Sequence, residues 1–480
     1  MALIAILIRI TSGSPILFTQ ERVGKVGCAK VNLIWWLFLL GNLALNYGNN
    51  KHCLYPTDSR QYRNKTMKNF LLKLARQKLI KFIFLLFLLL TSISIFGKVG
   101  TMNDSNSPST APRNSSLTTS KSAKTTTKFA KVNIRADGTN LVNEQPFFPF
   151  GFYHVSWEST AEELIQDLEE IGLAGFNTIH AAATNLDDYG EFLDRAEKLG
   201  VYVVSEQNIG LLNLINAFKH KPAVLGWNLA DDVDNGRLVA EGVLKFNQQA
   251  KLADPHHITY ITGYTENIKE FRKCADVVAM QSYPIGHAEE ENDDISLTYD
   301  KISLVRDAVS PYKKAVYANV QAFAWEHTKE PHSIRVPTFD EVRNMTYQAL
   351  LGGAKGIIYY AYHDQLWHLS SHPALWAGMK TLVPEIKAIS SLVLNGQLNK
   401  IDVGVEKVIA GMWREENQSL IVIINRSYKR RGVSIAIPGN FSQIKPIFDN
   451  RPATLVLNAN RLSGFLTPLG VEVYQATTEF

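Results

Sequence analysis

The sequence predicts an α/β protein: a (β/α)8 (TIM) barrel, followed by a small antiparallel β-sandwich and preceded by a membrane segment. Between residues 130 and 398, short apolar runs alternate with stretches of helical periodicity, as in a parallel barrel of this length. From residue 399 to 480 the runs become short and alternating, which is typical of antiparallel strands. Before residue 99, a basic segment leads into an uncharged apolar run.

Composition narrows the class of protein. The chain has 480 residues, of which 46% are hydrophobic and 20% charged, so it can form one large domain or several smaller ones with real cores. The net charge of +5 is modest and lies partly in the N-terminal region, so we expect no nucleic-acid partner. Cys28, Cys53 and Cys274 lack the spacing of a zinc site or a disulfide framework.

The clearest targeting signal begins at Met67. Lysines and arginines between residues 68 and 81 precede an apolar run of 15 residues from Phe82 to Phe96. No good small-x-small cleavage site follows, so we interpret residues 67–98 as an uncleaved signal-anchor that binds the membrane and places the barrel outside the cytoplasm. The alternative is cleavage and secretion. Residues 99–129, rich in Ser and Thr, are expected to form a disordered tether.

Residues 1–27 carry a separate resemblance. The segment from Leu7-Ile8-Arg9-Ile10 to Gly24 resembles the opening of a bacterial polyprenyl-phosphate sugar transferase. The later acidic and basic motifs of that family do not follow. We therefore interpret residues 1–66 as a truncated fragment or a start codon called too early, because so short a piece cannot supply a catalytic core.

The barrel prediction rests on strands and helices in alternation. The expected strands are residues 147–154, 178–182, 201–205, 224–230, 258–262, 277–281, 315–321 and 356–362, and the expected helices include 160–171, 186–199, 211–218, 237–253 and 338–351. A doubly wound open sheet is the rival fold. It would normally offer a Gly-rich phosphate turn after its first strand, and Phe150-Gly151-Phe152-Tyr153 is no such turn. We expect no cofactor.

Acids and aromatic residues gather where the predicted strands end. Active sites of (β/α)8 barrels lie at the carboxyl ends of the strands, and flat rings beside carboxylates favour a carbohydrate partner. The catalytic candidates are Asp232, Glu206, Asp231 and Asp364. The substrate-binding candidates are His154, Trp157, His180, Asn208, Tyr283, Gln321, Trp325, Glu326, Tyr362 and Trp367. The alternative is structural: Asp231 and Asp232 would cap a helix, and the rings would close the barrel.

Residues 145–395 resemble a glycoside hydrolase of the large (β/α)8 clan. The resemblance is carried by Phe148-Pro149-Phe150-Gly151-Phe152-Tyr153, by the run from Leu225 to Asp232 and by Gly353-Ala354-Lys355-Gly356-Ile357-Ile358-Tyr359-Tyr360. It implies that Asp232 is the acid/base. It also implies a nucleophilic Glu at the end of the seventh strand, where this chain has Gln321, and an amide cannot form the glycosyl ester.

The departure at Gln321 leaves two readings open. In a hydrolase of polysaccharide O-glycosidic bonds, Glu206 is the preferred second carboxylate, followed by Asp364 and Glu326, and Gln321 would bind sugar hydroxyls or orient water. In the other reading the barrel binds carbohydrate without catalysis. A membrane sugar transferase is a third and weaker reading.

No metal site is predicted. His368 and His372 are four residues apart, but the Ser370-Ser371 turn and Pro373 argue against a shared helical face.

In the C-terminal segment we expect strands at 408–413, 420–425, 432–437 and 471–474. This small β domain would either bind sugar or cover the barrel, and we favour covering.

Overall fold

The computed structural model describes residues 129–155, 159–182, 185–206, 210–286, 294–325, 335–364 and 367–478. The transferase-like fragment, the expected signal-anchor and almost all of the expected tether lie outside these ranges. Within them, no helix has the length and apolar character needed to cross a membrane.

The described chain forms a closed barrel of eight parallel strands, as predicted. Each strand lies beside the one before it, and β11 pairs in parallel with both β10 and β4, which closes the ring. The strands are β4 (Phe150–Val155), β5 (Thr178–Ala182), β6 (Tyr202–Glu206), β7 (Val224–Ala230), β8 (Ile258–Gly263), β9 (Val277–Ser282), β10 (Ala315–Gln321) and β11 (Gly356–Asp364).

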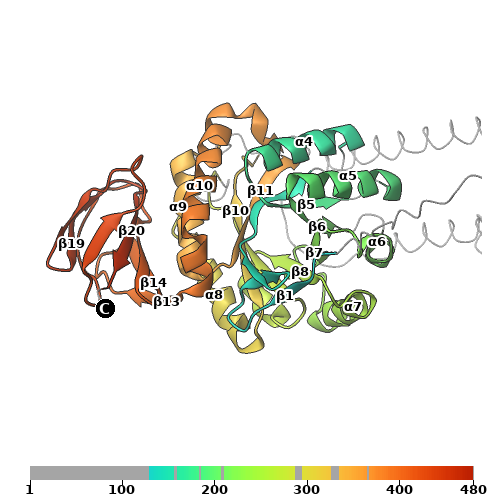
Figure 1. The fold of residues 1–480 in the computed structure, drawn as a ribbon, viewed down its shortest axis with the longest axis horizontal. Coiled ribbons are helices and arrows are strands. Elements are labelled where there is room, and N and C mark those ends of the chain that lie inside the picture. The colour runs from blue at the N-terminus through green and yellow to red at the C-terminus, as the bar shows by residue number, and fades with distance from the viewer. Residues whose placement is uncertain are drawn as a thin grey trace, which may run out of the picture. The chain divides into compact units, whose positions relative to one another are not determined.

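Helices surround the barrel (Figure 1). They are α4 (Ala161–Leu173), α5 (Leu186–Leu199), α6 (Leu211–Phe218), α7 (Ala240–Ala253), α8 (Leu297–Val309), α9 (Phe339–Gly352) and α10 (Pro373–Asn395). After β8 the chain forms only the 3-10 helix η1 (Glu266–Phe271), and shorter elements are η2 (Ser310–Tyr312), β12 (Trp367–His368) and η3 (Leu369–Ser371). Several helices begin at strong caps. Thr160 and Thr338 each form a capping box with the Glu three residues later, which fixes the starts of α4 and α9.

A small sheet at the start of the described chain was missed by the sequence patterns. It consists of β1 (Val132–Ile134), β2 (Asn140–Val142) and β3 (Gln145–Phe147), and the first barrel strand begins only at Phe150 rather than at residue 147. Strands of three residues are too short to show alternation. Val132 N donates to His256 O (2.8 Å) just before β8, so this sheet lies at the amino-terminal end of the barrel, opposite the predicted site.

The C-terminal segment forms two antiparallel sheets with a shared core. One sheet has β13 (Gln397–Ile401), β14 (Val408–Glu415), β15 (Gln418–Asn425), β20 (Val471–Thr477) and β17 (Gln443–Pro446); the other has β16 (Arg431–Ala436), β19 (Arg461–Leu466) and β18 (Leu455–Asn458). Met412 and Ile421 of the first sheet pack in one cluster with Ile435 and Leu462 of the second. The predicted antiparallel domain is confirmed, although four of its strands were not anticipated.

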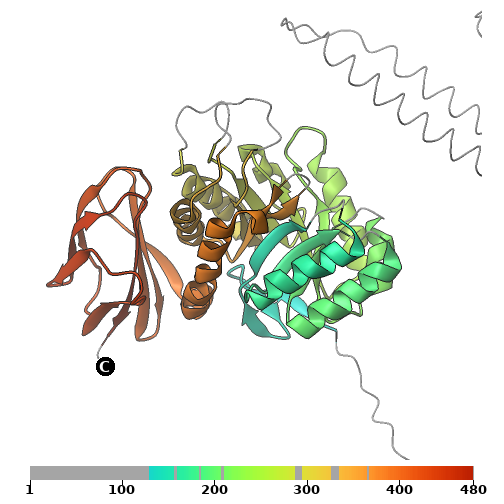
Figure 2. The same ribbon diagram turned by 90° about the horizontal axis from the view of Figure 1, so that it is seen from above.

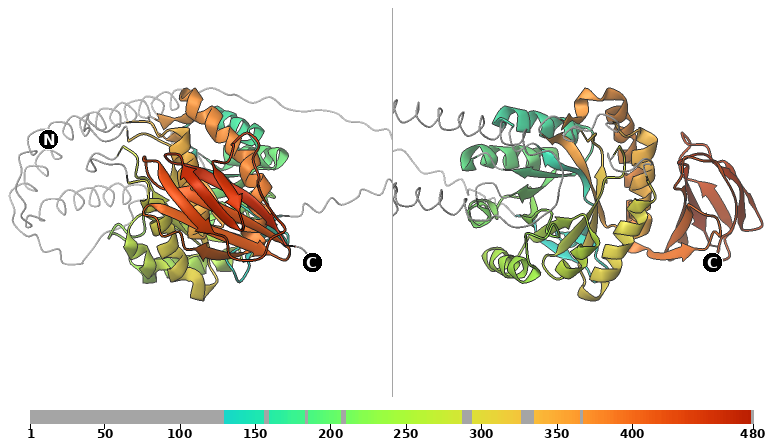
Figure 3. Two further views of the ribbon diagram at one scale, coloured as in Figure 1. Left: turned by 90° about the vertical axis from the view of Figure 1, so that its left-hand side faces the viewer. Right: turned by 180° about the vertical axis from the view of Figure 1, so that it is seen from behind.

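Only Gly396 separates α10 from β13. The five-stranded sheet packs on α9 and α10, and β19 of the second sheet lies beyond it (Figure 1). The same order is visible from above (Figure 2) and from the side and back (Figure 3). The C-terminal domain therefore covers the last two helices of the barrel.

Candidate active site

A cavity of about 430 Å³ opens at the carboxyl ends of the barrel strands. Its walls come from the strand ends and loops of β7 to β11 and from α8. The lining residues are Asp231, Asp232, Tyr264, Gln281, Ser282, Tyr283, Pro284, Leu297, Lys301, Phe323, Trp325 and Tyr360. The volume falls within the range of small-molecule sites.

Asp232 enters the cavity because the chain turns sharply after β7. Strand β7 is buried to its last residue but one, and a side chain at Gly226 would meet Ile258 O at 2.5 Å, so the strand packs too closely against β8 for any other residue. Asp232 has φ +48°, a left-handed conformation that Asp and Asn tolerate better than most residues. Gln281 Nε2 donates to Asp232 Oδ1 (2.7 Å) and holds the half-buried carboxylate in place.

The turn that carries Asp232 is itself fixed by a buried acid. The Asp234 carboxylate accepts from Tyr264 N (3.1 Å), from Thr265 N (2.7 Å) and from Thr265 Oγ1 (2.8 Å). Val233 N also donates to Thr262 O (3.0 Å). Asp234 therefore has a structural role: it ties the loop after β7 to the loop after β8.

Asp231 lies among buried tyrosines. It accepts a hydrogen bond from Tyr153, whose pKa is raised far above its ordinary value by burial and by the Asp231 and Glu206 charges. Burial and the same Asp231 charge also raise the pKa of Tyr260 and Tyr283. These hydroxyls remain protonated at all working pH values, so Tyr153 can donate to a charged Asp231.

Four aromatic rings that contact one another line the same cavity as the acids. Tyr283 and Phe323 meet edge to face (centroids 5.2 Å apart), and Phe323 packs against Trp325 (4.9 Å) and Tyr360 (5.2 Å). All four line the cavity. The structure therefore places the predicted residues Tyr283 and Trp325 beside Asp231 and Asp232.

Gln321 does not face the cavity, and the expectation that it binds sugar is corrected. It is fully buried at the end of β10. Its Oε1 accepts from Ile285 N (2.7 Å), and its Nε2 donates to Ile285 O (2.7 Å) and Phe323 O (3.0 Å). The amide thus braces the loop after β9, and neither end of it points to a substrate.

Two further acids flank Tyr360. Glu206 is 3% exposed at the end of β6, and Asp364 ends β11, where its Oδ2 accepts from Tyr360 Oη (2.5 Å). Burial and then the charges of Asp364, Asp231 and Glu206 raise the pKa of Tyr360 above its usual range. Neither Glu206 nor Asp364 belongs to the cavity lining.

Three other predicted binding residues are buried away from the cavity. His180 lies inside the barrel, with its ring 4.7 Å from that of Tyr153 and 4.5 Å from that of Tyr260. Tyr362 points to the outer helix layer, where it packs on Trp376 and donates to Glu170. Trp367 stacks on His372 and donates Nε1 to Ala361 O (2.9 Å). All three are fully or almost fully buried core residues, which corrects their expected role in binding.

The remaining candidates cannot be placed. Trp157, Asn208 and Glu326 lie outside the described residues, as does the side chain of His154.

The sequence patterns missed several lining residues, namely Gln281, Phe323, Lys301 and Tyr360. Strand alternation puts Tyr360 and Tyr362 on one face, whereas the register of β11 against β4 shifts between Tyr360 and His363, so that only Tyr360 faces inward. Lys301 comes from a helix rather than a strand end. A search confined to strand ends could not find it.

One group of described side chains has the composition of a metal site: Asp167, His363 and His368. His363 Nδ1 lies 2.8 Å from Asp167 Oδ2, and His368 Nε2 lies 3.2 Å from Asp167 Oδ1. Ser370 Oγ lies 2.7 Å from the second nitrogen of His368. Each Asp167 oxygen thus already has an imidazole partner, and the cluster ties α4 to β11 and β12 as a hydrogen-bonded unit. His372, four residues after His368, is not part of this cluster and stacks on Trp367.

No known family matches the sequence, and no curated protein sequence matches it. Solved structures with a similar fold include one titled "Glycoside hydrolase" (12% identity, covering 73% of this chain and 97% of that one, TM-score 0.49). Another is an α-amylase from Geobacillus thermoleovorans complexed with acarbose (10% identity, covering 72% of this chain and 100% of that one, TM-score 0.49). A third is a GH30 endoxylanase from Clostridium papyrosolvens C71 (10% identity, covering 72% of this chain and 100% of that one, TM-score 0.43). At these values the similarity assigns no reaction, and the barrel is established by its own strand order.

Proposed function

We propose that this protein is a glycoside hydrolase that cleaves an O-glycosidic bond of a polysaccharide in the cavity around Asp232. The observation that carries the proposal is the composition of that cavity: two adjacent carboxylates and four aromatic rings line it together at the carboxyl end of a (β/α)8 barrel. Carboxylates supply the acid and base of glycoside cleavage, and the rings offer stacking surfaces for the apolar faces of sugars.

Asp232 is the proposed proton donor. It gives its proton to the glycosidic oxygen as the bond from that oxygen to the anomeric carbon breaks. Water completes the reaction by bonding to the anomeric carbon, and its proton passes to a carboxylate. Gln281, which donates to Asp232 Oδ1, fixes the orientation of this acid throughout.

Asp231 is the second carboxylate that the geometry favours, ahead of Glu206 and Asp364. It lines the cavity together with Asp232, whereas the other two acids do not belong to the cavity lining. The Tyr153 hydroxyl donates to Asp231 and so helps to hold this carboxylate in position.

A carbohydrate-binding barrel without catalysis is the alternative, and the end of β10 favours it. The clan nucleophile is expected there, and this chain has Gln321 bonded on both sides of its amide to backbone. Under this alternative the aromatic wall binds sugar while Asp231 and Asp232 only accept hydrogen bonds from it.

The proposal extends to the site of action. The basic segment and apolar run between residues 67 and 98 support an exported, membrane-anchored enzyme that acts on a polysaccharide at the cell surface or in the periplasm. A transferase role would require residues 1–66. Activity that is lost in a variant beginning at Met67 would favour that role.

The test is release of reducing ends from a panel of neutral and acidic polysaccharides by the wild type, Asp232→Asn and Asp231→Ala. We expect turnover by the wild type on at least one glycan and strong loss in both variants. Azide added to Asp231→Ala distinguishes the roles, because a small anion can replace a missing nucleophile or base. Glu206→Ala and Asp364→Ala, with and without azide, serve as comparisons. Loss of activity that azide restores only in Glu206→Ala would assign the second role to Glu206 instead.

A further inference from the structure

One wall of the cavity is not built by the barrel strands. Leu297 and Lys301 line it from the first turns of α8, one helical turn apart. Thr298, between them, is buried and its Oγ1 lies 2.9 Å from Ser282 Oγ at the end of β9. Ser282 adjoins Gln281, the residue that holds Asp232. The start of α8 is therefore linked to the proposed acid by two hydrogen bonds, one between Thr298 and Ser282 and one from Gln281 to Asp232, and Gln281 and Ser282 are neighbours in the chain.

The segment before helix α8 caps only part of its amino terminus: Asp294 Oδ1 accepts from Ser296 N (3.1 Å), and Asp294 O accepts from Leu297 N (3.1 Å). Its N-cap residue, Ser296, has helical backbone angles and makes no side-chain capping bond. The first turn of a helix leaves several backbone N–H groups without helical partners, and these must be satisfied from elsewhere. A start of this kind keeps its position only if other elements supply the missing contacts.

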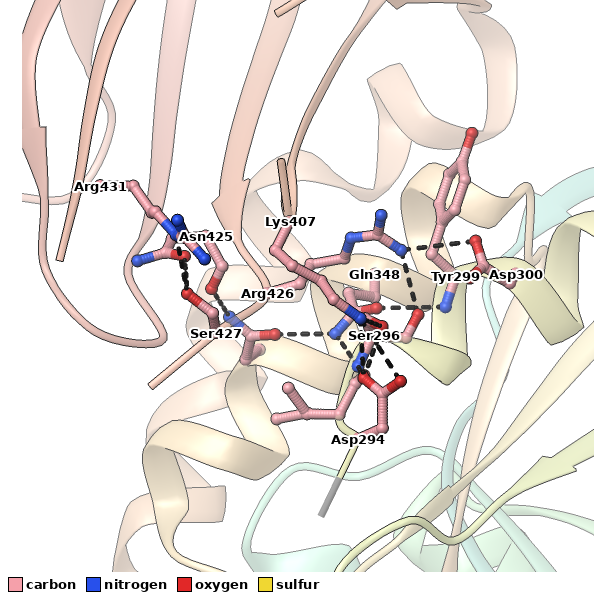
Figure 4. A network of polar contacts seen from close by, with 12 residues as sticks. Asp294, Ser296, Tyr299, Asp300, Gln348, Lys407, Asn425, Arg426, Ser427 and Arg431 are labelled. Carbon is pink, nitrogen blue, oxygen red and sulfur yellow. Dashed lines mark hydrogen bonds and ion pairs between the residues drawn. The ribbon is translucent and has the colours of Figure 1, made fainter. Parts of the chain in front are cut away.

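The C-terminal domain supplies one set of contacts (Figure 4). Lys407, just before β14, donates Nζ to Ser296 Oγ (2.7 Å) and pairs with Asp294 Oδ1 (3.2 Å). Arg426, just after β15, donates to Ser296 O (3.0 Å) and lies 5.3 Å from the ring of Tyr299. Two cations of the C-terminal domain thus clamp the segment that opens α8.

A second set runs through α9 (Figure 4). Asn344 Nδ2 donates to Asn425 O (3.0 Å) in the C-terminal domain, and Gln348 Nε2 donates to Asn344 Oδ1 (2.8 Å). Gln348 then accepts from Tyr299 N (3.2 Å) and donates to Ile295 O (2.8 Å). Asn344 and Gln348 are both fully buried. Gln348 therefore caps the Tyr299 N–H in the first turn of α8, and Asn425 of the C-terminal domain holds Gln348 in position through Asn344.

We infer that the C-terminal domain helps to position the active site. Its residues Lys407 and Arg426 hold the start of α8. Helix α8 in turn positions the cavity wall formed by Leu297 and Lys301, and it supports Asp232 through Ser282 and Gln281. Lys407 and Arg426 are positioning residues, because they touch α8 and not the cavity. The effect on catalysis rests on the proposed function, whereas the support that Lys407 and Arg426 give to α8 is independent of it.

The chain offers a matched control on the same domain interface. Arg451 of the C-terminal domain donates two hydrogen bonds to α10: Nε donates to Glu385 Oε1 (2.5 Å), and Nη2 donates to Thr381 Oγ1 (3.3 Å). No residue of α10 lines the cavity. Arg451→Met therefore removes one cation and its bonds from the interface, as Lys407→Met does, but at a helix that does not form the site.

The first measurement needs no substrate. Amide hydrogen exchange of the full chain is followed by mass spectrometry on peptides that cover residues 294–303. In Lys407→Met and Arg426→Met we expect about fivefold faster exchange of these amides. Each variant loses one hydrogen bond that stabilises the closed form, so local opening costs less free energy. Arg451→Met should leave these peptides as in the wild type, and Lys407→Arg should restore slow exchange. Unchanged exchange at 294–303 in both Lys407→Met and Arg426→Met overturns the inference.

The second measurement uses the glycan that the wild type hydrolyses fastest. A loosened wall weakens contacts made to substrate before and during the reaction, so Lys407→Met should raise KM about tenfold with a smaller change in kcat, while Arg451→Met stays within about twofold. Equal effects of Lys407→Met and Arg451→Met would reduce Lys407 to a general stabiliser and overturn the positioning role. If exchange changes as expected but the wild type hydrolyses no glycan, the inferred brace stands and the proposed function fails.

Discussion

The ends of β7 and β10 occupy equivalent places in the barrel and are used in opposite ways. After β7 the chain turns through a left-handed residue and brings two carboxylates to the wall of a cavity. At the end of β10 the side chain of Gln321 is buried and both ends of its amide are bonded to the loop after β9. A polar residue at a strand end therefore identifies chemistry only when its side chain reaches the cavity.

The sharpest way to break this comparison is to neutralise the acid at the end of β7. Asp232→Asn keeps the backbone conformation, since Asn also tolerates φ near +48°, and its carbonyl still accepts from Gln281. We expect kcat to fall by roughly 10³-fold because the proton donor is lost, with the melting temperature almost unchanged. Kinetics and thermal unfolding of the same preparation check both parts.

The reverse change at the end of β10 should damage stability instead. Gln321→Glu places a buried charge against the carbonyl oxygens of Ile285 and Phe323, which a carboxylate cannot donate to. We expect it to lower the free energy of unfolding by about 3 kcal/mol, measured by urea denaturation. Gln321→Leu, which has no charge, should cost less. A stable and more active Gln321→Glu variant would mean that the end of β10 faces substrate after all.

Substitutions of Trp325 and Trp367 should likewise differ in effect, the first on sugar binding and the second on thermal stability. Trp325 lines the cavity, so Trp325→Ala should weaken sugar binding by about tenfold through loss of a stacking surface. Trp367 is buried on His372, so Trp367→Phe should lower the melting temperature and leave sugar binding unchanged. Isothermal titration with an oligosaccharide and thermal unfolding separate the two effects. Loss of binding in Trp367→Phe would place β12 in the site.

The smallest expected effect concerns the Asp167, His363 and His368 cluster. The hydrogen bond to Asp167 raises the pKa of His368, which is about 6.5 in an unfolded chain. The stability that this protonated imidazole contributes is fully present below that value and is lost as pH rises through the higher folded pKa. Urea denaturation should therefore show a fall of less than about 1 kcal/mol above pH 6.5. His368→Asn should remove this part of the pH dependence, and an unaltered profile would contradict the assignment.

The sequence predicted the barrel well because its strands are continuous apolar runs with regular helices between them. It placed Asp231, Asp232, Tyr283 and Trp325 correctly at the strand ends, and these residues do line the cavity. It could not tell that Tyr362 faces outward, because a register shift in β11 breaks the alternation.

Other parts of the site depend on contacts that no local pattern contains. Lys301 belongs to a helix, and its place in the cavity follows from how α8 packs. The cap on α8 comes from Gln348, 49 positions away, and the clamp from Lys407 and Arg426 more than 100 positions away. Side-chain alternation and motif spacing describe one segment at a time and cannot predict such pairs.

The most direct test of the central claim is a paired comparison on one glycan: reducing-end release and binding, the latter by tryptophan fluorescence, for the wild type and Asp232→Asn. The account predicts that both proteins bind the sugar with similar affinity and that only the wild type releases reducing ends. Equal release by both proteins, or binding by the wild type with no release from any glycan, would contradict the proposal that Asp232 is the acid of a glycoside hydrolase.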